Sequence, residues 1–377
     1  MNFERTEQQQ LLCDAFQLLA RIDYTFEERS RILASACGVS DRFWAAFADM
    51  GLLGLSIPPE YGGFGGGAED LASVMEIIGE ALIVEPYLQT VGIGARIIAR
   101  AGSETMKVAI LPAIAEGRVK LALAYLERGG RYDLANVDTQ AVRTASGWAL
   151  HGGKQLVVQA QNADKLVLSA RIDGQAGDAD GIALFLVDAR CPGVTMRTYR
   201  TIDGNRAADI ELRDVEVGDD ALICGPREGH AVLEDAIDFA TFLLGAEAIG
   251  AVHSANEATL DYTKTRKQFG VAIGSFQVVQ HRIVDMFIGL EQLKSLVYLT
   301  AARLDEPCEP GQRRRMVSAL KIKTADTARL VSQESVQFHG GMGLTDELKV
   351  SHTFRRLTVI IQEFGDVDYH LERYTLE

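Results

Sequence analysis

The chain has 377 residues, of which 47% are hydrophobic and 24% charged, and its net charge is −14. This length predicts two or three packed units, and the composition is that of a globular protein. A chain this acidic repels phosphate backbones, so we expect no nucleic-acid partner. The longest apolar stretch, Phe239 to Val252, is interrupted by Gly245, Glu247 and Gly250. We therefore expect no segment that crosses a membrane.

The cysteines and the N-terminus both favour a reduced cytoplasm. Five cysteines lie at positions 13, 37, 191, 224 and 308, with no CxxC spacing. We therefore expect neither a disulfide framework nor a metal site. Residues Met1 to Arg5 lead into glutamines without a basic stretch followed by an apolar one, which predicts no secretory signal.

Residues 1–118 carry mostly helical patterns and are predicted to form an all-α domain. Asp41 is expected to cap a helix that Gly51 ends. A turn-rich stretch, Ile57 to Gly67, follows, and the helical period resumes from Leu71 to Ile78.

Residues 119–226 change to a period of two and are predicted to form a middle β-sheet or barrel domain. The expected strands are Leu121 to Leu126, Trp148 to Leu150, Lys165 to Ser169, Ile182 to Val187, Val194 to Arg197 and Ala208 to Leu212.

Residues 227–377 return to long helical patterns and are predicted to form a four-helix bundle domain. The expected helices are Ala231 to Arg266, Gln277 to Leu304, Arg315 to Phe338 and a final stretch from Glu347.

Five short motifs occur in order over nearly the whole chain. They are Pro59-Glu60-Tyr61-Gly62-Gly63, Leu111-Pro112 with Gly117, Arg266 to Gly270 followed by Phe276-Gln277, Gln337 to Gly343, and Phe354-Arg355-Arg356. Together they resemble the acyl-CoA dehydrogenase family. The resemblance implies FAD as cofactor, an acyl-CoA thioester as substrate, and an electron-transfer flavoprotein as electron acceptor.

The resemblance also implies which residues contact FAD. The adenosine diphosphate end of a flavin held mainly by the neighbouring subunit would meet Arg266, Gln268, Phe269, Gln277, Gln337, Gly340 and Gly341. An arginine fork and glycine backbone suit a pyrophosphate. Alternative interpretations are a helix-end charge for Arg266 and a plain helix C-cap for the glycines. His339 beside them is expected to be structural.

The chemistry of the family needs a carboxylate base at the α-carbon of the thioester. The two positions at which the family carries its glutamate are occupied here by Phe364 and Ala240, and neither side chain can accept a proton. Glu363 and Asp366 are the remaining, weak candidates. Their alternative interpretation is a polar helix start or cap.

The middle segment also departs from the family pattern. The expected T-E-P-x-x-G-S-D stretch is replaced around Leu126 to Asp133. In the family's W-I-T-N, a Trp packs on the flavin ring and a Thr contacts it. These two positions are Leu156 and Val158 here, in the stretch that ends at Gln159. The two halves of the expected site are therefore altered together.

This combination resembles the base-less subunit of two-component acyl-CoA dehydrogenases of the pimeloyl-CoA or steroid side-chain type. The resemblance implies an α2β2 heterotetramer with a base-bearing partner, inactivity of this chain alone, and a bulky acyl chain on the substrate. Two alternatives stay open. One is a self-sufficient homotetrameric dehydrogenase, flavin oxidase or monooxygenase with an unusual base, and the other is a non-enzymatic scaffold on the same fold.

Overall fold

The structure is a computed structural model that describes residues 7–375, so the expectation for Met1 to Arg5 concerns residues outside the described range. Residue contacts group the described chain into two compact units. The first unit contains residues 7–31, 67–83 and 241–375, and the second contains residues 32–66 and 84–240. Helices at both ends of the chain with a sheet between them confirm the predicted fold class. The domain boundaries near residues 118 and 226 stay a prediction.

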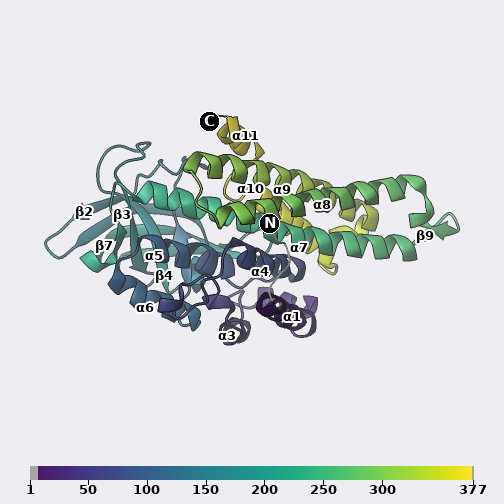
Figure 1. Cartoon of the computed structure of the whole chain (residues 1–377), viewed down its shortest axis with the longest axis horizontal. Helices are drawn as coiled ribbons and strands as arrows, with labels where there is room; N and C mark the ends of the chain where they lie inside the picture. The colour runs from purple at the N-terminus through teal and green to yellow at the C-terminus, as the bar shows by residue number, and fades with distance from the viewer. Residues whose placement is uncertain (1–6, 376–377) are drawn as a thin grey trace. The chain divides into compact units, whose positions relative to one another are not determined.

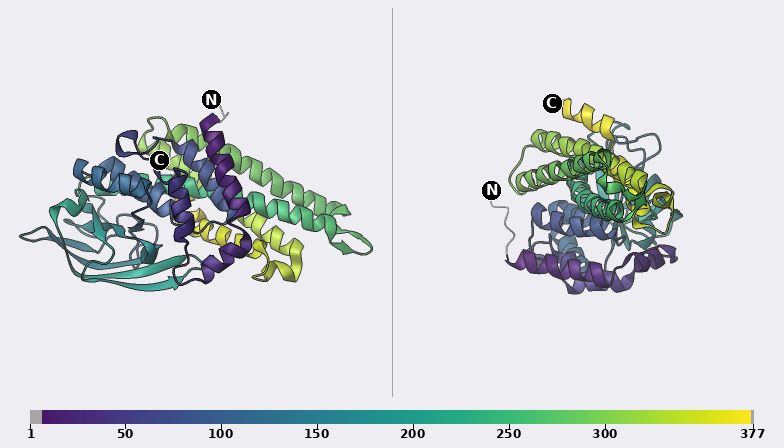
Figure 2. Two further views of the ribbon diagram at one scale, coloured as in Figure 1. Left: turned by 90° about the horizontal axis from the view of Figure 1, so that it is seen from below. Right: turned by 90° about the vertical axis from the view of Figure 1, so that its right-hand side faces the viewer.

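The first unit is helical (Figure 1). Its elements are α1 (Glu7–Ile22), α2 (Phe26–Ala34), α4 (Ala68–Ala81), α7 (Gly229–Thr265), α8 (Gln277–Leu304), α9 (Pro310–His339), α10 (Lys349–Gln362) and α11 (Val367–Thr375), of which α2 and α7 also extend into the second unit. Helices α8, α10 and α11 each pack against α9, and α8 runs alongside α9 in all views (Figure 2).

The long helices follow their predicted spans closely. Helix α8 has the predicted bounds, and α9 begins five residues early because Pro310 fits the first turn of a helix. The stretch expected from Glu347 is two helices. They are separated at residues 363–366, where Phe364 and Gly365 have φ values of 59° and 122° and so leave the helical conformation.

Helices α4 and α7 cross with their backbones in contact. A Cβ added at Gly79 would lie 1.9 Å from the Glu247 carbonyl oxygen, and one added at Gly250 would lie 1.8 Å from the Glu76 carbonyl oxygen. No side chain fits at either position, so only glycine permits this approach.

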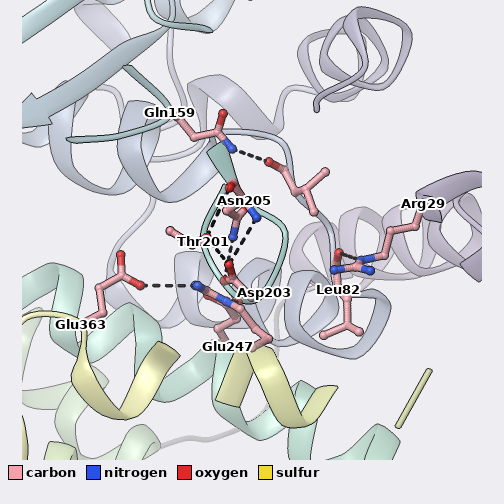
Figure 3. Close-up of polar contacts among 10 residues, drawn as sticks. Arg29, Leu82, Gln159, Thr201, Asp203, Asn205, Glu247 and Glu363 are labelled. Carbon is pink, nitrogen blue, oxygen red and sulfur yellow. Dashed lines mark hydrogen bonds and ion pairs between the residues drawn. The ribbon is translucent and has the colours of Figure 1, made fainter. Parts of the chain in front are cut away.

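The C-terminal end of α4 receives cations from two other segments. The Lys349 Nζ donates to the Glu80 carbonyl at 2.5 Å, and the Arg29 Nε donates to the Leu82 carbonyl at 2.6 Å. Figure 3 shows the Arg29 contact. Arg29 also bonds the Nδ1 of His352 at 2.9 Å. Positive charge satisfies the free carbonyls at a helix C-terminus, so α2, α4 and α10 are held at one point.

The second unit contains a sheet of eight strands in the order β6-β7-β3-β2-β4-β5-β8, with β1 beside β4. The strands are β1 (Leu121–Ala124), β2 (Gln140–Arg143), β3 (Trp148–Val158), β4 (Lys165–Arg171), β5 (Ile182–Asp188), β6 (Val194–Arg200), β7 (Arg206–Val217) and β8 (Leu222–Cys224). All six predicted strands are present, and β2 and β8 were not predicted. Apolar side chains of β3, β4, β5 and β7 form the core.

The second unit also holds helices from the N-terminal part of the chain. They are α3 (Asp41–Asp49), α5 (Arg96–Ala101), α6 (Glu104–Ala115) and a π-helix, Leu88–Ala95. The predicted cap Asp41 is wrong. The Ser40 hydroxyl caps α3 by accepting from the Phe43 N–H, while Asp41 is the first helical residue and pairs with Lys120 at 2.8 Å.

Helix α7 corrects the expectation about apolar segments. It is long and apolar enough to span a bilayer by length and composition, but 94% of its most apolar window is buried. Such burial is typical of a core helix, so this feature is weak evidence for a membrane span.

We expect Gly250→Ala to destabilise the chain, because the new methyl group overlaps the α4 backbone. The expected loss in the free energy of unfolding is about 3 kcal/mol or more, measured by urea titration. The control is Gly289→Ala in α8, whose Cβ would meet only side-chain atoms, those of Thr327 at 3.4 Å and of Leu330 at 3.9 Å. Equal effects of the two substitutions would contradict a backbone contact at this crossing.

Candidate functional site

The end of α7 leads into a small hairpin that presents an aromatic ring to solvent. Strands β9 (Lys267–Gln268) and β10 (Val271–Ala272) are joined by Phe269 and Gly270, with φ values of 55° and 82°. Both values belong to the left-handed region that tight hairpin turns require. Phe269 is 93% exposed. A large apolar side chain this exposed, on a backbone that favours glycine, suits contact with another molecule.

The end of α9 carries Gly340 and Gly341, and the structure accounts for the two glycines in different ways. Gly340 is the C-cap of α9, with φ 61°, which agrees with the alternative interpretation of this glycine. Gly341 has no such φ, and a Cβ there would meet nothing within 4 Å. Neither backbone conformation nor packing within the chain requires a glycine at 341. Close approach of an external group to the backbone is a remaining reason.

Ring contacts link the ends of α7, α8 and α9 within the first unit. The Tyr262 ring stacks on His339 with centroids 4.4 Å apart, and Phe269 meets Phe276 edge-on at 6.4 Å. The His339 Nδ1 donates to the Ser335 carbonyl at 2.8 Å, as expected for a structural histidine. On α8, Arg282 lies over the Phe338 ring. The segments that carry the predicted cofactor residues are thereby joined.

The polar side chains of this set make no hydrogen bond or ion pair within the part of the chain that the structure describes. These side chains are Arg266, Gln268, Gln277 and Gln337, and all are exposed. One guanidinium and three amides therefore keep their donors available. Such groups beside an open glycine backbone fit the charge and geometry of a pyrophosphate, so the residues present suit a nucleotide cofactor.

The turn that follows α10 carries an apolar side chain where a base was sought. Phe364 is buried, 7% exposed, with its backbone in the left-handed region. The neighbouring carboxylates have structural partners. Glu363 pairs with Arg356 at 3.4 Å (Figure 3), and the Asp366 Oδ1 accepts from the Tyr369 N–H at 2.9 Å, at the start of α11. These contacts match the cap and helix-start interpretation of both residues.

Arg356 organises a buried ion network that the sequence did not indicate. Its Nε and Nη2 bind the two carboxylate oxygens of Glu247 at 2.5 and 2.8 Å. Such a paired fork is strongly held when buried. The two residues lie 109 positions apart. The only sequence signal was Arg356 itself, where the family motif carries an aspartate.

In the second unit, Ala240 is buried within α7. Asp235, five residues earlier in α7, is paired with Arg96 at 3.0 Å and Arg100 at 2.9 Å. The start of α7 thus offers paired charge and small apolar side chains, and no carboxylate at position 240.

The sheet positions Leu156 and Val158 lie at the irregular end of β3. Between Lys154 and Val157 the pairing with β7 shifts register, and Leu156 has φ 49°. The Leu156 N–H donates to the Asp209 carboxylate at 3.2 Å. Gln159, which closes this stretch, is buried and donates to the Val84 carbonyl at 3.0 Å (Figure 3). Leu156 and Val158 are aliphatic, so these positions supply neither an aromatic face nor a hydroxyl group.

One buried ion pair anchors the altered loop before β2. The Lys154 Nζ lies 2.5 Å from a Glu127 carboxylate oxygen and 2.9 Å from the Ser169 hydroxyl. Glu127 also accepts from the Asp138 and Thr139 N–H groups. Burial lowers the pKa of Lys154 to about 8, although Glu127 acts in the opposite direction. This cluster is fully paired, so it fixes the loop.

Three family models match the chain in order. Acyl-CoA dehydrogenase, N-terminal domain, covers residues 6–118; the middle domain covers 122–215; and the C-terminal domain covers 227–372. Together they span most of the chain.

Curated and solved relatives agree with these matches. A (2S)-methylsuccinyl-CoA dehydrogenase of Cereibacter sphaeroides is 29% identical over 81% of this chain. The matched region spans 58% of the length of that relative. The structure of the ChsE4–ChsE5 complex from Mycobacterium tuberculosis contains a chain with 26% identity and a TM-score of 0.89, covering 99% of this chain and 97% of its own. The structure of a variant of the Tcur3481–Tcur3483 steroid ACAD contains a chain with 27% identity and a TM-score of 0.87. The match covers 98% of this chain and 96% of that one.

Proposed function

The chain belongs to the acyl-CoA dehydrogenase family, and we propose that it is the base-less subunit of a two-component enzyme that desaturates an acyl-CoA thioester. The observation that carries the proposal is the 363–366 turn. Its base position holds buried Phe364, while Glu363 and Asp366 are engaged by Arg356 and by the start of α11. Abstraction of the α-proton needs a free carboxylate within reach of the substrate, and a partner subunit would supply it.

FAD is the cofactor of this family. When bound, it accepts the hydride that leaves the β-carbon of the thioester. The role of this chain is to bind and orient the nucleotide end. Arg266 would pair with the pyrophosphate, Gln268, Gln277 and Gln337 would donate hydrogen bonds, and Gly340 and Gly341 would admit the phosphates to the backbone. Phe269 at the hairpin tip would pack against the adenosine part.

Two features support assembly with a second chain. Helix α8 carries exposed apolar side chains, namely Val278, Val284, Phe287 and Ile288, and such a face favours a protein interface. Similar chains occur in a complex, ChsE4–ChsE5, and in a steroid ACAD with a two-part name. We therefore propose an α2β2 heterotetramer that acts on a bulky, steroid-type acyl chain. The cytoplasmic location and the electron-transfer flavoprotein as acceptor stay predictions.

The two rival functions differ in what they require of particular residues. A self-sufficient enzyme requires Glu363 or Asp366 to act as base, and both carboxylates already have partners. A scaffold has no use for the exposed Arg266, which has no partner among the described residues, or for the open backbone at Gly341. Both features favour the subunit of a two-component enzyme.

The test of the proposal is the flavin content and mass of this chain purified alone and after co-expression with a base-bearing relative. We expect little flavin alone, because this chain supplies only the nucleotide-end contacts, and a flavin-loaded heterotetramer with the relative. One tightly bound FAD per chain in a homotetramer would overturn the proposal.

Within the loaded complex, Arg266→Ala should weaken FAD retention by about tenfold or more, since a charge-assisted contact to phosphate contributes about 1.5–3 kcal/mol. Retention is measured by flavin release during dilution. The matched control is Lys264→Ala, which removes an exposed charge two residues away that pairs with Asp261 at the surface. The role of Arg266 is refuted by equal retention in the two variants.

We expect Glu363→Gln and Asp366→Asn to leave kcat of the complex within about twofold, because neither carboxylate removes the proton. Loss of a true general base lowers the rate by about 10² or more. The assay compares a steroid side-chain thioester with butyryl-CoA. A collapse of kcat in either variant supports a self-sufficient enzyme, and faster oxidation of butyryl-CoA contradicts the proposed substrate class.

A further inference from the structure

The turn that replaces the base is held by two buried titratable side chains. The Lys321 ammonium donates to the Glu363 carbonyl. The His370 Nε2 donates to the Phe364 carbonyl at 3.1 Å, and its Nδ1 lies 3.2 Å from the Ser318 hydroxyl. Consecutive carbonyls of the turn are therefore bonded to a lysine of α9 and a histidine of α11.

The imidazole of His370 is packed without space for rearrangement. Its side chain is fully buried, and a Cβ added at Gly365 would lie 2.5 Å from its Nε2. The Tyr369 ring meets the imidazole edge-on at 5.1 Å. Since a carbonyl can only accept, Nε2 carries the proton and Nδ1 accepts from Ser318. The folded arrangement therefore uses a neutral His370.

The charges around this histidine are mostly positive. The titratable and charged groups that face the cluster are Lys321 and Arg315 from α9, Arg356 with Glu363 from α10 and its end, Glu247 from α7, and Asp366, Tyr369 and Arg373 from the turn and α11. The two carboxylates nearest the turn are already engaged, Glu363 by Arg356 and Asp366 by a backbone N–H. A proton on Nδ1 would thus add a cation beside Lys321 and Arg373.

Burial, with Lys321 and Arg373 beside it, lowers the pKa of His370 to about 3, and the bond to the Phe364 carbonyl only partly opposes this. Burial also lowers the pKa of Lys321 to about 7, with Glu363 opposing. Lys321 is therefore cationic throughout the acid range. A histidine released to solvent recovers its ordinary pKa near 6.5. Between pH 6.5 and about 3 the released form binds the extra proton, so falling pH favours release.

We propose that His370 is an acid-sensitive latch for the C-terminal helix: its protonation detaches α11 from α9 and frees the 363–366 turn. Helix α11 is short and is anchored on α9 through the buried imidazole and through Tyr374, over which Arg315 lies. Detachment of α11 breaks the two His370 hydrogen bonds and takes the only fully buried side chain of this helix out of the core. The turn then loses its bond at Phe364 and keeps the contacts of Glu363 with Lys321 and Arg356.

The test is hydrogen–deuterium exchange of residues 365–375 in the full chain between pH 7 and 4.5, corrected for the intrinsic exchange rate. In the wild type, the opening of α11 should increase by up to tenfold for each pH unit below about 6.5, while α4 keeps its protection. In His370→Gln, whose amide can still donate to the Phe364 carbonyl but does not titrate, this pH dependence should disappear. The control, exposed His281→Gln on α8, should behave as the wild type does.

The latch is overturned if α11 in the wild type opens no more at pH 4.5 than at pH 7, or if His370→Gln keeps the wild-type pH dependence. It is also overturned if α4 and α11 lose protection together, because that outcome is global unfolding. Should His370→Gln fail to fold, the wild-type comparison of α11 with α4 decides the question by itself. None of these readouts depends on flavin or on a partner subunit.

Discussion

The backbone contact between α4 and α7 at Gly79 and Gly250 is the constraint on which the first unit depends. The unit is built from residues 7–31, 67–83 and 241–375, which are far apart in sequence. Two helices without side chains at their crossing can approach more closely than ordinary packing allows. Lys349 and Arg29 then fix the end of α4 through its free carbonyls. The later helices are therefore placed against a fixed reference, and the ends of α7 and α9 can carry groups that no internal contact restrains.

The unit uses its polar groups in two opposite ways. At the hairpin and the end of α9, a cation and several amides are exposed and unpaired among the described residues, ready for an anionic ligand. Around the turn after α10, by contrast, charges are buried and mutually paired through Arg356, Glu247 and Glu363. Unpaired donors at an open surface cost little, whereas buried charge must be compensated inside the protein. The first arrangement favours binding, and the second favours a closed, chemically inert turn.

Much of this organisation could be predicted from sequence because it is local. The 3.6-residue period located α8 to the residue, and the ordered motifs identified the candidate FAD-contacting segments and the apolar side chain at 364. The local nature of these patterns also explains the wrong prediction of the α3 cap. Ser40 and Asp41 are both good N-cap residues, and only the backbone geometry decides between them. Strand β2 has one buried residue in four, too weak a signal to recognise. The Glu247–Arg356 pair and the support by Lys321 and His370 join distant segments, so no local pattern reveals them.

The construction of the 363–366 turn restricts which side chains position 364 can accept in evolution. A glutamate introduced at position 364 would have to adopt the left-handed backbone of Phe364, beside a carbonyl already engaged by His370 and an arginine already shared by two carboxylates. One codon change would therefore bury an uncompensated charge and still lack a productive orientation. A carboxylate at this position would therefore require compensating changes in several segments at once, so the packing of the turn favours retention of an apolar side chain at 364.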